Sequence, residues 1–371
     1  MDNKKNGIPK LRFPGFTGAW EQRKLGETSK ITAGGDVNKE KLLTHGKFPV
    51  IANALTNNGI VGYYNDYYRI AAPAVTVTGR GEIGKAKSRK INFTPVVRLL
   101  AVESKHNVDF LAEAINRSKV VFESTGVPQL TVPKLSNYKI SFPNSVDEET
   151  KIGDFLQQFD TLIALHQRKL EHLQEQKKGL LQKMFPKNGE NVPEVRFPGF
   201  TDAWEQRRLG EVTEIKTGSR NHQDSVDNGK YPFFVRSEKV ERLNEYDFDT
   251  KAILVPGDGR IGEIFHYYDG KFALHQRVYK VDNFKEVNPL YLLNLFKYKF
   301  KKHALRLNAQ GTVPSLRLPM FTNWNILIPN LNEQQKIGLF FQQLDSLITL
   351  HQRKLEHLKL MKKGLLQQMF V

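Results

Sequence analysis

The sequence predicts an α+β protein in which two mixed α/β domains are joined by two long antiparallel coiled-coil helices, with a pseudo-twofold internal repeat. Three observations support this prediction. Residues 11–27 return as 195–211 with 14 of 17 positions identical, and residues 152–185 return as 337–370 with 25 of 34 identical. The inserts between these blocks barely resemble each other but are rich in β-branched residues, which favours strands. The second block of each repeat has the apolar spacing of a coiled coil.

The length and charge of the chain limit the number of domains and the kind of partner to be expected. A chain of 371 residues can hold two ordinary domains, each with its own core. The formal net charge of +17 and the isoelectric point near 9.7 favour a polyanionic partner. Residues 1–185 carry 28 Lys+Arg against 18 Asp+Glu, and the remainder carries 28 against 21, so both halves share the excess. The alternative is a basic protein with no such partner.

Several classes of protein are disfavoured. The chain has no cysteine, which excludes a disulfide framework and a thiolate metal site. Its first residues, MDNKKNGIPK, lack the apolar core of a signal peptide. No apolar run approaches the roughly 18 residues of a membrane span. We therefore expect a cytoplasmic protein.

The first repeated block contains FPGF, whose Pro, Gly and aromatic residues predict a tight turn fixed by packing, with Trp20 and Trp204 as core anchors. Within the inserts, β-branched runs and helical apolar spacing predict the remaining elements. We expect strands at 74–78, 91–102, 139–144, 252–256, 277–281 and 325–330, and helices near 108–122 and 288–303.

A long helix closes each repeat, with Asp147 and Asn332 as candidate N-caps and a stop at Phe185–Pro186 in the first. Sampling each helix in alternating steps of four and three gives an apolar seam. The seam residues are Ile152, Leu156, Phe159, Ile163, Leu170, Leu173 and Leu180, and Ile337, Phe341, Leu344, Ile348, Leu355, Leu358 and Leu365.

Two polar positions in each seam predict the orientation of the helices. A parallel pair would set Lys177 against Lys362 and His166 against His351, and like charges facing each other at a seam are costly. An antiparallel pair places Lys177 near Leu344 and Lys362 near Phe159, along which the lysine stems can lie. We therefore predict antiparallel packing within one chain. The alternative is a homodimer in which a helix pairs with its own copy.

Each helix also carries apolar residues outside the seam, and these have two interpretations. They pack against the inserts of the chain itself, or they dock partner subunits. About 35 helical residues span about 50 Å, on the order of 15 base pairs of DNA, so the helices could fix a distance between two DNA half-sites. The residues outside the seam are Phe155, Leu162, Leu165 and Leu181, and Phe340, Leu347, Leu350 and Leu366.

One motif resembles a nucleotide-binding loop. GRGEIGK (79–85) matches G-x-G-x-x-G, but Ala86 stands where a P-loop needs a hydroxyl, and a strand rather than a helix is expected to follow. The second repeat has GDGRIGE (257–263). We interpret both as glycine hairpins whose basic flanks could face DNA, with a solvated loop as the alternative. The helix residues His166, Lys169, Glu171 and His172 do not make a convincing catalytic or metal site.

The repeated FPGF-x-x-x-WE-x-x-x-LGE blocks, the GVPQL and TVPSL closings and the QRKLEHL-x-x-x-KKGLLQ helices resemble the specificity subunit of type I restriction–modification systems. The resemblance implies a non-catalytic subunit that binds double-stranded DNA, two methyltransferase subunits and, where present, restriction subunits. It implies target recognition domains at 1–146 and 187–331 and conserved helices at 147–186 and 332–371. S-adenosylmethionine, ATP and magnesium would be bound by the partners, and no cofactor or metal by this chain.

Under this resemblance, the DNA-contacting residues are expected on and beside the glycine hairpins, beside the two closings and, in the second insert, also at Arg220 and Arg236. Arginine and glutamine are favoured because Arg reads guanine and Gln reads adenine best. Polar residues at the closings could instead only satisfy the backbone. Two rival functions are a nucleotide-dependent enzyme using Lys85 and a scaffold that coats nucleic acid without specificity. The expected contacts are Arg80, Lys85, Lys87, Arg89, Thr125 and Gln129, and Arg220, Arg236, Arg260, Gln310, Thr312 and Ser315.

Overall fold

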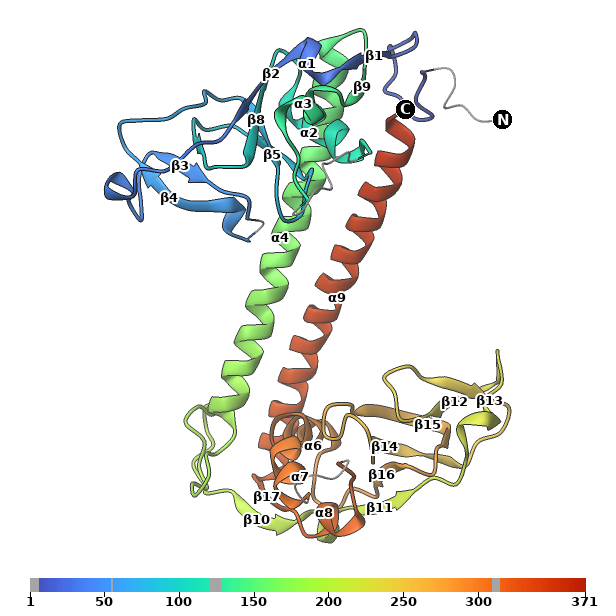
Figure 1. Cartoon of the computed structure of the whole chain (residues 1–371). Coiled ribbons are helices and arrows are strands. Elements are labelled where there is room, and N and C mark those ends of the chain that lie inside the picture. Colours follow the sequence, from blue (N-terminus) through green and yellow to red (C-terminus); the bar gives the residue numbers. More distant parts are fainter. Residues whose placement is uncertain (1–6, 55, 120–127, 309–313) are drawn as a thin grey trace. The chain divides into compact units, whose positions relative to one another are not determined.

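The computed structural model describes residues 7–54, 56–119, 128–308 and 314–371 (Figure 1). The chain forms two compact units, and each combines one insert with parts of both long helices. Unit 1 comprises Met1–Gln167 and Arg353–Val371, and unit 2 comprises Arg168–Gln352. Sequence reasoning treats each long helix as a segment of its own, whereas the fold shares each helix between the two units.

Unit 1 holds three small sheets, with strand orders β2-β8-β5-β6, β4-β3-β7 and β1-β9. All five residues of β5 are buried, as its run of Ala, Val and Thr predicts. The strands are β1 (Glu21–Lys24), β2 (Ser29–Ala33), β3 (Phe48–Ile51), β4 (Ile60–Tyr64), β5 (Ala74–Thr78), β6 (Ala86–Arg89), β7 (Thr94–Pro95), β8 (Leu99–Ser104) and β9 (Lys139–Phe142). The helices are α1 (Leu25–Thr28), α2 (Val108–Arg117) and α3 (Val132–Ser136), with 3-10 turns at Lys39–Lys41 and Thr56–Gly59.

Unit 2 joins its insert strands into one six-stranded sheet of order β11-β16-β14-β15-β12-β13, beside the pair β10-β17. The strands are β10 (Glu205–Arg208), β11 (Glu214–Thr217), β12 (Tyr231–Phe234), β13 (Glu241–Leu243), β14 (Phe248–Pro256), β15 (His266–Leu274), β16 (Val278–Asp282) and β17 (Asn325–Ile328). The helices are α5 (Leu209–Val212), α6 (Pro289–Leu295), α7 (Lys301–Leu307) and α8 (Leu318–Thr322), with a 3-10 turn at His222–Asp224 and a π-helical turn at Phe296–Phe300 between α6 and α7.

The two inserts share one topology although their sequences barely match. Along the six-stranded sheet, β11, β16 and β14 correspond to β2, β8 and β5 of unit 1, and β12 and β13 correspond to β3 and β4. The strand order of unit 2 therefore equals the unit 1 order β2-β8-β5-β6 followed by β7-β3-β4. A single strand, β15, takes the places of both β6 and β7, because it pairs antiparallel with β14 and, at its end, parallel with β12. The mixed α/β domains of the prediction are therefore confirmed, and the repeat extends through the inserts.

Most predicted insert elements are confirmed, but the single strand expected over 91–102 is wrong. The chain forms β7, turns through residues 96–98, and then forms β8. Arg98 adopts a left-handed φ of 73° in this turn, which the Leu99 amide closes on the Val96 carbonyl at 3.0 Å. The β-branched residues of this stretch hid the turn, in which residues 97 and 98 leave the strand. Of the helix expected near 108–122, residues 120–122 lie outside the described ranges.

The two long helices are α4 (Val146–Met184) and α9 (Leu331–Met369), and both predicted N-caps are wrong. Ser145 caps α4, because its Oγ accepts from the Asp147 amide at 3.2 Å. Asn330 caps α9, because its Oδ1 accepts from the Glu333 amide at 3.0 Å. Asp147 and Asn332 lie inside the first turns. The helix α4 ends before Phe185, as expected, and Pro186 follows.

The repeated FPGF turn is fixed to the start of the long helix by the same contacts in both units. Arg12 forms a two-pronged ion pair with the buried Glu148, at 2.7 and 2.8 Å, and Arg196 does so with the buried Glu333, at 2.8 and 2.6 Å. Edge-to-face ring pairs join Phe13 to Phe155 and Phe197 to Phe340. Trp20 and Trp204 are buried in the two main cores, which confirms their predicted role as anchors.

The helices run antiparallel within each unit, as predicted. In unit 1 the Lys362 ammonium contacts the Asp160 carboxylate at 2.6 Å, and Ile152 and Leu156 share a core with Met369 and Phe370. The α9 numbers therefore fall as the α4 numbers rise. In unit 2 Lys177 pairs with Asp345. All fourteen predicted seam residues are buried or half-buried, and the first two of each helix belong to the core of an insert.

Among the residues that the structure describes, none of the helices has a stretch both long and apolar enough to span a bilayer.

Candidate nucleic-acid interface

Both glycine motifs form hairpins, as predicted. GRGEIGK joins β5 to the antiparallel strand β6, and GDGRIGE leads from β14 towards its antiparallel neighbour β15. Gly81 and Gly84 in the first loop, and Gly259 and Gly262 in the second, have positive φ values, which glycine adopts without strain. Neither loop opens a helix, so neither offers phosphate the row of amides of a nucleotide-binding loop.

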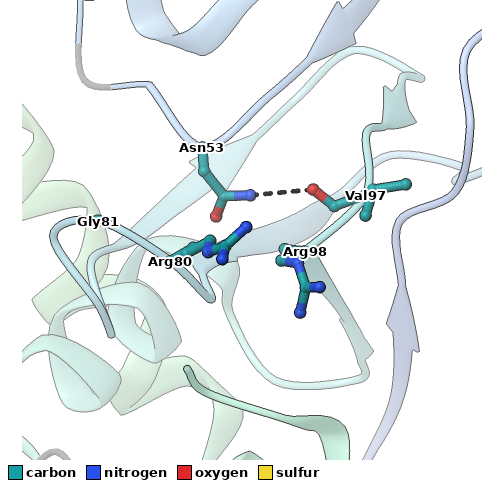
Figure 2. Close-up of a pocket in the computed structure, with 5 residues that line it drawn as sticks. All are labelled: Asn53, Arg80, Gly81, Val97 and Arg98. Atoms are coloured by element: carbon teal, nitrogen blue, oxygen red, sulfur yellow. Dashed lines mark hydrogen bonds between the residues drawn. The ribbon is translucent and has the colours of Figure 1, made fainter. Parts of the chain in front are cut away.

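In unit 1 the first hairpin lines a cavity of about 300 Å³ together with two other loops. Figure 2 shows Asn53, Arg80 and Arg98 gathered around this cavity, with Gly81 and Val97 completing its wall. Asn53 connects the three loops, because its Oδ1 accepts from the Gly79 amide at 2.8 Å and its Nδ2 donates to the Val97 carbonyl at 3.2 Å. Arg98 in turn donates to the side-chain oxygen of Gln129.

The predicted contacts of the first insert divide into two groups. Arg80 and Gln129 belong to the cavity loops, and Lys85 is exposed on the same hairpin. Lys87 and Arg89 are engaged elsewhere: Lys87 contacts Asn58, and Arg89 donates to the Thr76 hydroxyl at 2.9 Å. Burial lowers the pKa of the Arg89 guanidinium to about 10, so this side chain is already partly removed from solvent.

The predicted arginines of the second insert are all paired with carboxylates. Arg220 contacts Asp247 and Glu245, each at 2.9 Å, through different nitrogens. Arg236 contacts Asp258 at 3.3 Å. Arg260 contacts Glu238 and Glu263 at 2.9 Å. In the first insert, by contrast, no carboxylate of the described ranges lies within ion-pair distance of Arg80, Lys85 or Arg98.

The second hairpin also gathers charged groups from several loops. Ser315 forms an isolated bridge with Asp258, and the Leu316 amide donates to the Gly257 carbonyl at 2.6 Å. Burial lowers the pKa of the His275 imidazole, and the charges of Arg236, Asp258 and Arg277 also act on that pKa. These charges therefore lie near the buried His275, which directly follows β15.

Three predicted contacts, Thr125, Gln310 and Thr312, lie outside the described residues. Sequence reasoning missed Asn53, Arg98 and Arg277, although Arg98 has its own place in the cavity wall. The alignment of Arg98 with Arg277 was the available signal, since each stands directly before the strand that precedes the insert helix. The divergent sequences around them concealed it.

The exposed hairpins carry groups that can bind nucleic acid. Guanidinium, ammonium and amide groups on exposed hairpins are donors suited to base edges and phosphate oxygens. Within the described part of the chain, no group of three or more His, Cys, Asp or Glu residues could hold a metal ion. The helix residues His166 and His172 therefore belong to no metal cluster of described residues.

Four of the eight apolar residues outside the helix seam pack against the inserts, as one interpretation predicts, and docking of partner subunits by the other four stays a prediction. Phe155 and Leu366 pack against the core of unit 1, and Leu181 and Phe340 pack against the core of unit 2. The other four are largely exposed, at 43% and 53% for Leu162 and Leu165 and at 46% and 45% for Leu347 and Leu350. The exposed pairs occupy equivalent positions in the two repeats.

Comparison with known proteins gives a consistent result. Residues 18–175 and 201–360 each match the model of the type I restriction modification DNA specificity domain. The chain is 31% identical over 146 residues to the type I restriction enzyme EcoDI specificity subunit of Escherichia coli, which is 39% of this chain and 31% of that protein. It is 25% identical over 280 residues to the MjaVIII specificity subunit of Methanocaldococcus jannaschii, which is 66% of this chain and 64% of that protein.

These matches thus span less than two thirds of either relative. The fold is also similar to that of a solved type I restriction-modification S subunit from M. genitalium, with a TM-score of 0.75 and 16% identity over 98% of this chain and 99% of that one.

Proposed function

Because the chain belongs to the type I restriction modification DNA specificity domain family, we propose that it is the DNA-binding specificity subunit of a type I restriction–modification complex. Each insert reads one half of a bipartite, asymmetric DNA target. The observation that carries the proposal is the pair of inserts with one scaffold and different charged side chains on their exposed hairpins. One scaffold presents both sets to DNA, and the differing side chains give the halves different sequences.

The long helices have two roles in this proposal. They set the spacer between the half-sites, and they dock two methyltransferase subunits. The exposed leucine pairs Leu162–Leu165 and Leu347–Leu350 support docking, because the same apolar surface appears once per repeat and so fits two copies of one partner. Such a surface is unfavourable in water unless a partner covers it.

The chemistry belongs to the partners. We propose that the methyltransferase subunits hold S-adenosylmethionine, that restriction subunits, when present, use ATP and magnesium, and that this chain binds neither cofactor nor metal. The net charge of +17 supports a role in bringing the complex to DNA. We propose that the complex acts in the cytoplasm.

The decisive experiment is to map methylated adenines in DNA from cells that express this chain together with its methyltransferase subunits. We expect one interrupted sequence with two different halves. Methylation without a sequence preference would support the non-specific scaffold instead. ATP binding by the chain alone that disappears in Lys85→Ala would support the nucleotide-dependent enzyme.

The same mapping tests the spacer. Removing one heptad from each long helix keeps the 3.5-residue seam in register and shortens the pair by about 10 Å, which corresponds to about 3 base pairs. We expect a shorter spacer with both half-sites unchanged. Altered half-sites with a constant spacer would contradict the role of the helices.

A further inference from the structure

The loops that gather around Arg98 in unit 1 are joined by the same backbone hydrogen bonds as those around Arg277 in unit 2. The Val97 amide donates to the Gly35 carbonyl at 3.0 Å, and the Gln276 amide to the Arg220 carbonyl at 2.9 Å. Three further bonds are matched in the same way. In unit 1 the amides of Val96, Leu99 and Leu130 donate to the carbonyls of Ile51, Val96 and Gly79, respectively. In unit 2 the amides of His275, Val278 and Leu316 donate to the carbonyls of Phe234, His275 and Gly257, respectively.

A close approach of the backbone is also repeated. A Cβ on Gly34 would lie 2.0 Å from the Val96 carbonyl oxygen, and one on Gly218 would lie 2.0 Å from the Leu274 carbonyl oxygen. Both glycines are therefore required for the loop crossing. The sequences of the crossing loops differ, so the matched bonds define an equivalence that sequence comparison did not find.

This equivalence pairs side chains position by position. One position carries arginine in both inserts, Arg98 and Arg277, and four neighbouring positions carry different side chains. The differing pairs are Asn53 and Arg236, Arg80 and Asp258, Val97 and Gln276, and Gln129 and Ser315. We name these five positions in each insert the loop cluster.

We propose that each loop cluster reads base edges of one half-site, with Arg98 and Arg277 each reading a guanine and the four differing positions selecting the neighbouring bases. This inference rests on the proposed function and assigns its specificity-determining residues. Arginine donates two parallel hydrogen bonds to O6 and N7 of guanine. In unit 1 the contact with Gln129 orients the Arg98 guanidinium, and no described carboxylate competes with a base for it.

The differing positions predict that the two half-sites differ beside the guanine. Arg80 adds donors in the first cluster, whereas Asp258 is an acceptor in the second, already held by Arg236 at 3.3 Å. A carboxylate accepts from the amino group of cytosine, which Arg80 cannot do. The same scaffold thus presents opposite hydrogen-bonding patterns at one position.

The test uses methylation mapping with the full chain and its methyltransferase subunits. Arg277→Gln should relax or change one base pair of one half-site, with discrimination at that pair falling about five- to hundredfold, and should leave the other half-site intact. Arg98→Asn should do the same to the other half-site; asparagine is chosen because it tolerates the left-handed backbone there. Lys230→Ala and Lys105→Ala, exposed lysines on the same inserts, serve as matched controls.

The outcomes distinguish failure of the proposed function from failure of the role assigned to Arg98 and Arg277. If the unaltered chain directs no sequence-specific methylation, the proposed function fails before any variant is compared. If it directs a defined target and Arg277→Gln or Arg98→Asn lowers methylation equally at all sequences, the arginines contact phosphate and the inference alone is overturned. A target without guanine in either half would overturn it as well.

Discussion

The framework, by which we mean the repeated FPGF turns and the long helices α4 and α9, and the loop clusters repeat in opposite ways. In the framework the side chains themselves are repeated, as in the buried ion pairs Arg12–Glu148 and Arg196–Glu333. In the loop clusters the backbone hydrogen bonds are repeated and the side chains are exchanged, as with Arg80 and Asp258. Side chains are retained where they hold the fold, and they vary where matched backbone hydrogen bonds join the loops.

This difference explains how one scaffold can carry two specificities. A loop cluster held largely by backbone amide and carbonyl groups tolerates substitution of most of its exposed side chains, although in unit 1 the Asn53 side chain also joins the loops. The framework has no such freedom, because the removal of one partner from a buried ion pair leaves the other charge uncompensated. Changes in the framework should therefore affect stability, and changes in the clusters should affect specificity.

The largest expected effect comes from the framework ion pairs. Glu333→Ala should destabilise unit 2 by about 3–5 kcal/mol, because the carboxylate is fully buried and its loss leaves the Arg196 guanidinium, itself only 10% exposed, without its partner. Glu148→Ala should do the same to unit 1. Denaturant unfolding followed by hydrogen exchange would measure the effect and assign it to a unit.

The control is Glu205→Ala, which removes a carboxylate that is 70% exposed and should change stability by less than about 0.5 kcal/mol. Equal loss of protection in both units after either substitution would contradict the independent roles of the two ion pairs.

A second prediction concerns the helix ends, which complete the cores of the two units. Phe370, just after α9, packs edge-to-face on Trp20 at 5.9 Å, and Phe185, just after α4, does so on Trp204 at 6.0 Å. Phe370→Ala should destabilise unit 1 by about 3 kcal/mol. The expected readout is lost amide protection in β5 and β8, with β14 and β16 unchanged; the reverse pattern would refute this assignment of the chain end.

Sequence reasoning predicted the framework well because its signals are local or periodic. The seam follows from apolar spacing, and the antiparallel orientation follows from Lys177 and Lys362, whose partners Asp345 and Asp160 stand next to the predicted Leu344 and Phe159. The N-caps failed by two residues because Ser145 and Asn330 precede equally plausible Asp147 and Asn332, and only the backbone geometry distinguishes them.

The candidate interface was less predictable, because it is assembled from loops far apart in the chain. The hairpins carrying Arg80 and Arg260 were identifiable from their glycines. The partners were not: Asn53 reaches the first hairpin through a hydrogen bond to Gly79, 26 residues later. Composition also could not show that the arginines of the second insert are paired with carboxylates while Arg80 is not.

The smallest expected effect again contrasts the two units, through the pH dependence of the seam lysines. Burial lowers the pKa of the Lys362 ammonium, but Glu113 at 2.5 Å and Asp160 at 2.6 Å outweigh burial and leave the pKa raised. At Lys177 burial outweighs the attraction of Asp345, and the pKa is lowered. The two lysines should therefore respond oppositely to alkaline pH.

The direction of each pH effect on stability follows from the linkage between proton binding and folding. A raised pKa means that charged Lys362 stabilises unit 1 below its ordinary value of 10.5, and this contribution is lost as the pH rises through the folded pKa. A lowered pKa means that charged Lys177 costs unit 2 stability, and the cost disappears as the pH rises through its folded pKa towards 10.5. Each contribution should be on the order of 1 kcal/mol or less.

Comparing Lys362→Met and Lys177→Met with the unaltered chain between pH 8 and pH 11 isolates the two contributions. The advantage of the unaltered chain over Lys362→Met should shrink with pH, whereas its advantage over Lys177→Met should grow; parallel trends would show that the two seam lysines have the same environment.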